Sequence, residues 1–188
     1  MSQATGTVQP GGMTAEEFWD RQDEFEGCEL IDGEVVEMSP TKAPHGRSEV
    51  RIGAELDRYF DSNAVSPADV VGGEVGYQVG TKIVRASDVS VHLKGIGEAD
   101  AKGWHRTPPD LVVEVVSPND TWPEVERKLL DWSRFGVGEI WVADPRHERL
   151  TIRRSDEPAL VFEGDELVTS PLLPGFSVPA WRLFKRRR

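Results

Sequence analysis

The chain of 188 residues contains a single cysteine, Cys28. One cysteine cannot form an intrachain disulfide, and it also excludes a cysteine-rich zinc site. The sequence has no apolar run long enough to span a membrane and no hydrophobic segment typical of a secretory signal, so we expect a cytoplasmic protein. It also has no glycine-rich phosphate loop, which argues against the use of ATP.

Basic side chains are also scarce. The chain has 22 Lys and Arg against 33 Asp and Glu, which gives a net charge of −11. A general basic surface of the kind that binds nucleic acid is therefore excluded. Any contact with DNA would need local patches of arginine and lysine, or else it would be weak and sensitive to salt.

The length and the two ends of the chain suggest a simple organisation. At this length one domain is expected, and the chain can bury a core without disulfide or metal staples. Residues 1–12 are small, polar and glycine-rich, so we expect them to be disordered. The expected domain covers residues 13–184, and residues 185–188 form a basic tail. A capping box at Thr14 predicts the first helix of the domain.

The central stretch is an apolar run over residues 111–116 that contains one acidic side chain, Glu114. A short continuous run of β-branched residues is typical of a strand buried on both faces. An ionised carboxylate at such a place is costly unless it is paired or binds a metal. Glu114 is therefore a candidate functional residue.

A helix over residues 123–135 is predicted to follow this strand. Pro123 suits a first helical turn, and the apolar side chains of the segment share one face. Lys128 lies within that apolar face. A buried ion pair with Glu114 and a lysine that extends past the apolar surface to water are both compatible with this placement.

A third candidate, Asp88, lies in a strand predicted over residues 83–93. Asp88, Ser90 and His92 alternate there with valines, which indicates a half-buried strand. An aspartate at this place is also typical of a turn. Together with Glu114 and Lys128, however, it favours a functional site.

These segments, taken in order, resemble the Uma2 family, also called DUF820, of the PD-(D/E)XK restriction-endonuclease-like superfamily. The resemblance runs from about Met13 to Phe184 and rests on these stretches: Cys28–Pro40, Arg85–Val89, Pro109–Pro118, Glu124–Lys128 and Glu139–Pro145. It implies an α/β fold with a restriction-endonuclease-like mixed β-sheet flanked by helices. Extra β-hairpins are expected at the N- and C-terminal ends.

The resemblance also implies roles for the three candidates. In the superfamily two acidic residues bind a divalent metal and a lysine aids the chemistry. Carried over, Asp88 and Glu114 would bind Mg²⁺ or Mn²⁺, and Lys128 would be the lysine. Ser87 stands where the superfamily usually has a proline, and Val116 stands at the usual lysine position, so the lysine would have moved onto the helix.

Three further residues are secondary candidates. Glu29 lies on a hairpin predicted over residues 28–38, and it is the fourth choice for catalysis because the family pattern places an acidic residue there. A solvated strand residue is the competing interpretation of Glu29. Glu49, on a helix predicted over residues 45–60, ranks below Glu29. His45, near the start of that helix, would bind a phosphate or cap the helix.

The sequence therefore predicts a metal-dependent endonuclease that hydrolyses DNA phosphodiester bonds. A non-catalytic interaction protein on a nuclease fold and a metal-dependent hydrolase of a small phosphorylated substrate remain alternatives, and the acidic charge suits the latter better than DNA. DNA is the expected partner, and the resemblance also suggests a homodimer. A basic groove beside Asp88 would favour nucleic acid, and its candidate residues are Lys42, Arg47, Lys82, Arg85 and Arg106.

Overall fold

The computed structural model describes residues 12–63, 68–98, 100 and 103–185. Its backbone divides into two compact units: a smaller one of residues 1–40, 76–86 and 97–108, and a larger one of residues 41–75, 87–96 and 109–188. Except for Gly12, the segment expected to be disordered lies outside the described residues, and so does the tail beyond Lys185. The expected single domain over residues 13–184 stays a prediction.

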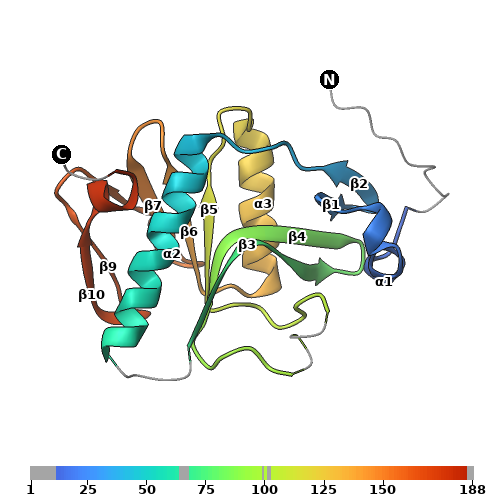
Figure 1. Cartoon of the computed structure of the whole chain (residues 1–188), viewed down its shortest axis with the longest axis horizontal. Helices are drawn as coiled ribbons and strands as arrows, with labels where there is room; N and C mark the ends of the chain where they lie inside the picture. The colour runs from blue at the N-terminus through green and yellow to red at the C-terminus, as the bar shows by residue number, and fades with distance from the viewer. Residues whose placement is uncertain (1–11, 64–67, 99, 101–102, 186–188) are drawn as a thin grey trace. The chain divides into compact units, whose positions relative to one another are not determined.

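The smaller unit contains a β-hairpin that pairs with the first part of a long strand (Figure 1). Its strands are β1 (Cys28–Ile31), β2 (Glu34–Glu37) and the start of β4 (Ile83–His92), all antiparallel. Asp32 and Gly33 in the hairpin turn have φ angles of 52° and 84°. Two successive positive φ angles are what a type I′ turn requires, so the predicted hairpin is confirmed.

A short helical segment packs on this hairpin. It consists of α1 (Ala15–Asp20) and η1 (Gln22–Glu24). The predicted capping box is present, because the Thr14 hydroxyl accepts a hydrogen bond from the Glu17 N–H and the Glu17 side chain accepts one from the Thr14 N–H. Phe18 of α1 is buried in an apolar cluster with Leu30 and Val84.

The larger unit is built on a mixed sheet with the strand order β4-β5-β6-β7-β8. The new strands are β5 (Leu111–Val115), β6 (Glu139–Asp144), β7 (Arg149–Arg153) and β8 (Leu160–Glu163), and β3 (Asp69–Gly80) also pairs with β4. β5 and β6 are parallel, whereas β4–β5, β6–β7 and β7–β8 are antiparallel. A separate two-stranded sheet follows, formed by β9 (Leu167–Ser170) and β10 (Leu173–Pro179), and then η3 (Ala180–Leu183). The predicted mixed α/β fold is confirmed.

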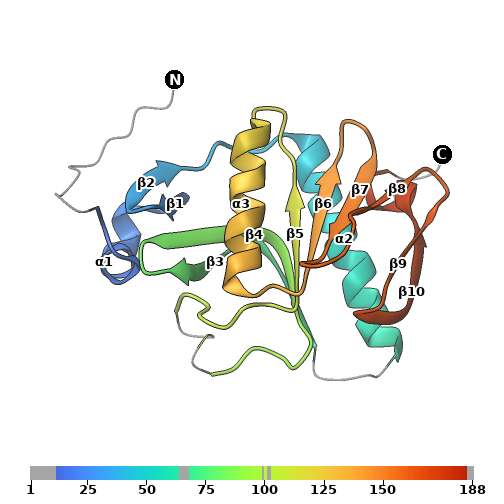
Figure 2. The same cartoon turned by 180° about the vertical axis from the view of Figure 1, so that it is seen from behind.

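Two helices cover opposite faces of this sheet (Figures 1 and 2). They are α2 (Ala43–Asn63) and α3 (Trp122–Phe135), and α3 connects the parallel strands β5 and β6 as predicted. Ile52 and Leu56 of α2 pack into the main apolar core with Val113 and Val115 of β5. No helix in the described part of the chain is long and apolar enough to cross a membrane.

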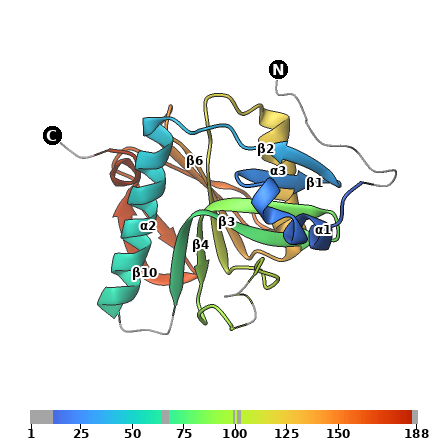
Figure 3. The ribbon, with the colours of Figure 1, turned by 45° about the vertical axis from the view of Figure 1, so that its right-hand side comes forward.

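One edge of the larger unit brings several element ends together. The β5 strand ends there (Figures 1 and 2), and both α2 and α3 begin there (Figure 3). The β4 strand that runs beside β5 is buried from Val84 to His92, not half-buried as the alternation predicted. The prediction was wrong because the polar side chains of this strand also lie in the protein interior, where Asp88 bonds to the β5 backbone.

Candidate active site

Asp88 lies on β4 in the larger unit and is only 9% exposed. Its Oδ2 accepts a hydrogen bond from the Val115 N–H at 2.6 Å, and its Oδ1 lies 3.4 Å from Nε2 of His45. Burial raises the pKa of Asp88 from 3.8 to about 6, and the nearby carboxylates of Glu49 and Glu74 add to the rise. The Lys128 ammonium and the Val115 N–H oppose it. The site therefore disfavours the bare negative charge of Asp88.

Two side chains of α2 complete a cluster around Asp88. His45 and Glu49 are four residues apart and so lie on the same face of the helix. One donor atom from each of His45, Glu49 and Asp88 lies within 4.8 Å of the other two. Burial lowers the pKa of His45, although the Glu49 charge opposes this, so the imidazole is neutral near pH 7. A neutral imidazole can donate its lone pair to a metal.

The backbone of β3 passes close to this cluster through two glycines. The Gly73 N–H donates a hydrogen bond to Oε1 of Glu49 at 3.2 Å. A Cβ at Gly72 would lie 3.3 Å from the carbonyl oxygen of Asp88. This distance is shorter than most contacts of a Cβ atom, so any larger residue would crowd the Asp88 backbone. The φ angle of Gly73 is 83°, a conformation that suits glycine. These glycines therefore allow β3 to approach Asp88 and fix the orientation of Glu49.

Glu114 and Lys128 form an ion pair next to Asp88. Oε2 of Glu114 lies 2.8 Å from Nζ of Lys128, and Oε1 accepts a hydrogen bond from Nε1 of Trp132 at 2.6 Å. Glu114 is buried, and the Lys128 side chain is 23% exposed. The apolar face of α3 thus carries Lys128 to the Glu114 carboxylate. The Lys128 ammonium also lowers the pKa of Asp88 and of His45 through its charge.

The structure brings the predicted site residues together in part. Asp88, Glu114 and Lys128 are neighbours in the larger unit, but the cluster suited to a metal combines Asp88 with His45 and Glu49. Both oxygens of Glu114 already have protein partners. Each oxygen keeps a second lone pair, so metal binding by Glu114 stays a prediction.

Glu29, the fourth candidate, lies in the smaller unit. It accepts hydrogen bonds from Arg85 Nη1 at 2.8 Å and from the Ala86 N–H at 2.9 Å. Glu29 is 7% exposed, so the competing prediction of a solvated strand residue is wrong. Arg85 is also buried and paired with Glu29, so the prediction that it lines a DNA groove is wrong as well. A catalytic role for Glu29 stays a prediction.

The cluster around Asp88 suits a divalent cation. Carboxylate oxygens are the ligands that Mg²⁺ and Mn²⁺ prefer, and an imidazole favours the transition metal of the two. The mutual repulsion of Asp88, Glu49 and Glu74 would be relieved by a positive ion between them. His45, Glu49 and Asp88 therefore fit the expected metal.

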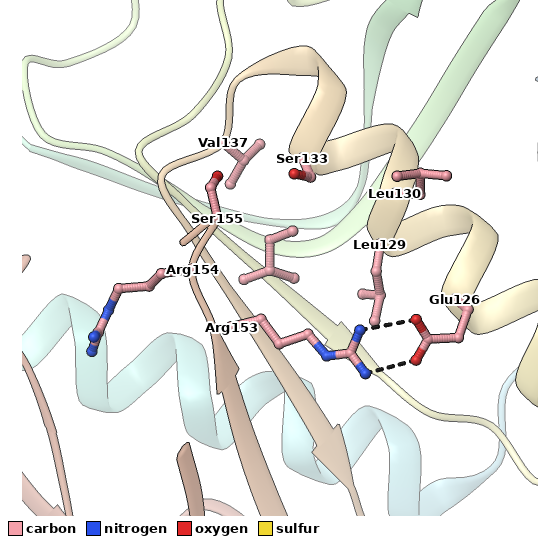
Figure 4. A pocket seen from close by; sticks show the side chains of 9 residues that line it. Glu126, Leu129, Leu130, Ser133, Val137, Arg153, Arg154 and Ser155 are labelled. Carbon is pink, nitrogen blue, oxygen red and sulfur yellow. Dashed lines mark hydrogen bonds and ion pairs between the residues drawn. The ribbon is translucent and has the colours of Figure 1, made fainter. Parts of the chain in front are cut away.

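A pocket of about 220 Å³ lies elsewhere in the larger unit, between α3 and the end of β7 (Figure 4). Its apolar wall includes Leu129 and Val137. Arg153 at its rim forms two hydrogen bonds with Glu126, at 2.6 and 2.9 Å. Arg154 is held by Glu139 at 2.7 Å. None of the Asp88 cluster lines this pocket, and its arginines are already neutralised, so it is not the candidate active site.

Comparison with known proteins identifies the family. The profile of Uma2, described as "Putative restriction endonuclease", matches residues 15–181. The chain belongs to the Uma2 family. A crystal structure described as "a putative nuclease belonging to DUF820", from Anabaena variabilis ATCC 29413, matches this Uma2 chain with a TM-score of 0.70 and 19% sequence identity. The match covers 84% of this chain and 89% of that one, and it shows a shared fold. No curated protein matches the chain.

Membership of Uma2 supports a nuclease-like function but does not identify the functional residues. Sequence reasoning ranked Glu49 below Glu29 and gave His45 only a phosphate-binding or capping role. A signal for both was present, because His45 and Glu49 lie on the same helical face as the core residues Ile52 and Leu56. Like Lys128, they are polar side chains on an apolar helix face.

Proposed function

We propose that this Uma2 protein is a metal-dependent endonuclease that hydrolyses DNA phosphodiester bonds. The observation that carries the proposal is the cluster of His45, Glu49 and Asp88 next to the ion pair of Glu114 and Lys128. A nuclease description of both the family and the structural neighbour supports this choice of chemistry. We infer Mn²⁺ or Mg²⁺ as the cofactor from the donor atoms of the cluster.

Each residue has a role in the proposed reaction. Asp88, Glu49 and His45 would hold the cation, with Glu114 as a further ligand. A bound cation would polarise the scissile phosphate and lower the pKa of a water molecule. Lys128 would donate hydrogen bonds to a phosphate oxygen and stabilise the negative charge that develops on it. Glu114 holds Lys128 in place through the ion pair of 2.8 Å. Trp132 in turn holds Glu114 through a hydrogen bond of 2.6 Å.

The edge of the sheet adds a second attraction for phosphate. The positive ends of the α2 and α3 dipoles both lie there. Helix N-termini of this kind favour anions, including phosphate groups. Lys42 and Arg47, at the start of α2, are exposed and add positive charge next to His45. These features support a DNA strand at this edge despite the acidic net charge of the chain.

The acidic charge favours one alternative, a metal-dependent hydrolase of a small phosphorylated substrate. A net charge of −11 repels a long polyanion but hinders a small one much less. Both enzymes would use the same metal cluster and the same lysine. They differ in substrate, so a cleavage assay that offers both DNA and a small phosphodiester separates them.

The proposal is tested by metal binding and cleavage measured together. Isothermal titration calorimetry with Mn²⁺ and Mg²⁺ should show binding by the wild type, and binding should be lost in Asp88→Ala. Glu114→Ala tests the predicted role of Glu114 as a ligand. DNA cleavage should require the metal and should fall in Lys128→Ala. Absence of metal binding at millimolar concentration would overturn the enzymatic proposal and leave an interaction protein on a nuclease fold.

A further inference from the structure

Trp122 is an exposed aromatic residue at the beginning of α3. Its exposed fraction is 58%, and it is the only exposed aromatic side chain among the described residues. Trp132 and Trp141, in contrast, are fully buried. Tryptophan is mostly buried in folded proteins because its large ring carries much apolar surface. An indole ring open to solvent therefore needs an explanation.

The backbone that carries Trp122 is tightly fixed. Thr121 and Glu124 form a capping box in which the Thr121 N–H and hydroxyl donate to Glu124 at 2.9 and 2.6 Å. Pro123 restricts the first turn of the helix. Before the helix, Asp120 accepts a hydrogen bond from the Ser117 N–H at 2.7 Å. The exposed ring is thus carried by a well-ordered backbone, so binding a ligand there would cost little conformational entropy.

Trp122 also begins the helix that carries Lys128, at the edge where the candidate active site lies. The loop before it follows directly from β5 (Figure 2). Glu114 of β5 forms the ion pair with Lys128. The Asp120 carboxylate, two residues before Trp122, acts electrostatically on His45. Trp122 therefore lies at the same end of the larger unit as the cluster that would hold the scissile phosphate.

The net charge of the chain indicates what the ring could bind. A chain with a charge of −11 gains little from general electrostatic attraction to DNA, so its affinity must come from other contacts. Aromatic rings supply such a contact by stacking on bases, and this stacking tolerates any base sequence. In a duplex the base faces are hidden within the helix, whereas in a single strand they are accessible.

Building on the proposed function, we propose that Trp122 stacks on an unpaired base next to the scissile phosphate. The substrate would then be single-stranded or locally unpaired DNA, and Trp122 would determine this preference. The alternative, that the ring contacts a protein partner, predicts no dependence of DNA binding on Trp122.

The test compares the affinity of two forms of DNA for wild-type protein and variants. A fluorescently labelled single strand and the same strand annealed to its complement are titrated with protein, and anisotropy is recorded. Ca²⁺ replaces Mg²⁺ as the oxygen-binding cation, and gel electrophoresis verifies that the strand stays intact. Trp122→Ala should weaken single-strand binding roughly tenfold, and Trp122→Phe should retain most of the affinity. Duplex binding should be nearly unchanged in both variants.

Leu130→Ala is the matched control, because Leu130 is a large apolar side chain of the same helix with 47% exposure. It should leave the affinity for both forms of DNA unchanged. Intrinsic tryptophan fluorescence gives a second readout. A stacked base should quench the fluorescence of the exposed Trp122 ring in the wild type, and Trp122→Ala, which lacks this ring, should not show the quenching. Equal losses for the single strand and the duplex would overturn the stacking proposal.

The same experiment separates this inference from the proposed function. If the wild type binds DNA and Trp122→Ala binds the single strand equally well, stacking is wrong and the nuclease proposal stands. If the wild type binds neither form of DNA in the presence of the cation, both proposals are wrong.

Discussion

Two buried carboxylates of this chain, Glu29 and Asp88, have opposite surroundings. Glu29 faces the guanidinium of Arg85 at 2.8 Å and the Ala86 N–H at 2.9 Å, so each of its oxygens meets a donor. Asp88 receives one backbone hydrogen bond, and its pKa is raised to about 6 by burial and by neighbouring carboxylates. The protein thus neutralises Glu29 with a cation of its own, whereas the cation that acts on Asp88, Lys128, is already paired with Glu114.

This difference distinguishes a structural charge from a functional one. A buried charge whose partner is part of the fold needs nothing further from solution. A cluster of acids without a matching cation destabilises the folded chain unless a ligand supplies the charge. Strongly perturbed acids in such clusters are typical of functional sites. We therefore expect metal binding at Asp88 and a structural role at Glu29.

The largest effect is expected from Asp88→Asn, which keeps the size of the side chain and removes its charge. Calorimetry should show no Mn²⁺ binding, because the amide is a much weaker ligand than the carboxylate. DNA cleavage should fall by about a thousandfold or more, since the cation contributes several kcal/mol to stabilising the transition state. Gel-based cleavage assays with purified variants measure this change.

Glu29→Gln is the matched control for this substitution. It should leave metal binding unchanged but leave Arg85 buried without its anionic partner. Breaking a buried ion pair in this way costs roughly 3–5 kcal/mol of unfolding free energy, which chemical denaturation can measure. Loss of metal binding in Glu29→Gln, with the fold intact, would restore Glu29 to the catalytic site and contradict the comparison.

Lys128→Met tests another buried acid of the larger unit, Glu114. Methionine keeps the apolar stem of the lysine but removes the ammonium group, so cleavage should fall by roughly 10²–10³-fold. Metal binding should be retained, because Lys128 is not a ligand and its positive charge opposes a nearby cation. Unchanged cleavage would exclude Lys128 from the chemistry.

The double variant Lys128→Met with Glu114→Gln should recover stability that the single variant loses, because no buried charge is left without its partner.

The sequence predicted those contacts that depend on local periodicity. The apolar run around Glu114 predicted a buried strand, and the helical face that contains Lys128 placed this lysine toward the sheet. A short connection between the two elements then left few other positions for the lysine. The turn at Asp32 and Gly33 was predictable for the same reason, because two residues determine its geometry.

Contacts between elements far apart in sequence could not be predicted in this way. His45 and Glu49 reach Asp88 only because α2 packs across the sheet with Ile52 and Leu56 in the core. The sequence showed their common helical face but not which strand that face would meet. The predicted exposure of β4 was wrong for a related reason. Alternating polar residues indicate a solvent-exposed face of a strand only if no other element covers that face.

A smaller effect is expected in the pH dependence of stability. The pKa of Asp88 is raised from 3.8 to about 6 in the metal-free fold, so between these values the folded chain binds more protons than the unfolded one. Unfolding free energy therefore decreases as pH rises through this window, and the full cost applies above it. Asp88→Asn should remove this cost and stabilise the metal-free protein above pH 6 by up to about 3 kcal/mol.

Calorimetric unfolding in EDTA at several pH values measures this effect. The gain from Asp88→Asn should disappear below the lower end of the window, where the wild-type carboxyl is protonated in both states. Added Mn²⁺ should raise the melting temperature of the wild type but not of the variant. A variant that is less stable than the wild type at every pH would show that Asp88 is a structural acid like Glu29.

The smallest effect is expected from His45→Gln, which tests whether the Asp88 cluster prefers Mn²⁺ to Mg²⁺. Glutamine removes the imidazole nitrogen that faces Asp88 at 3.4 Å but keeps a polar side chain of similar reach. Because imidazole favours transition metals over Mg²⁺, Mn²⁺ affinity should fall by about tenfold, whereas Mg²⁺ affinity should change much less. Calorimetric titrations with the two ions give the ratio directly. Equal losses for both ions would mean that His45 orients Asp88 and does not bind the cation. A loss confined to Mn²⁺ would assign His45 as a ligand and separate this site from one built on carboxylates alone.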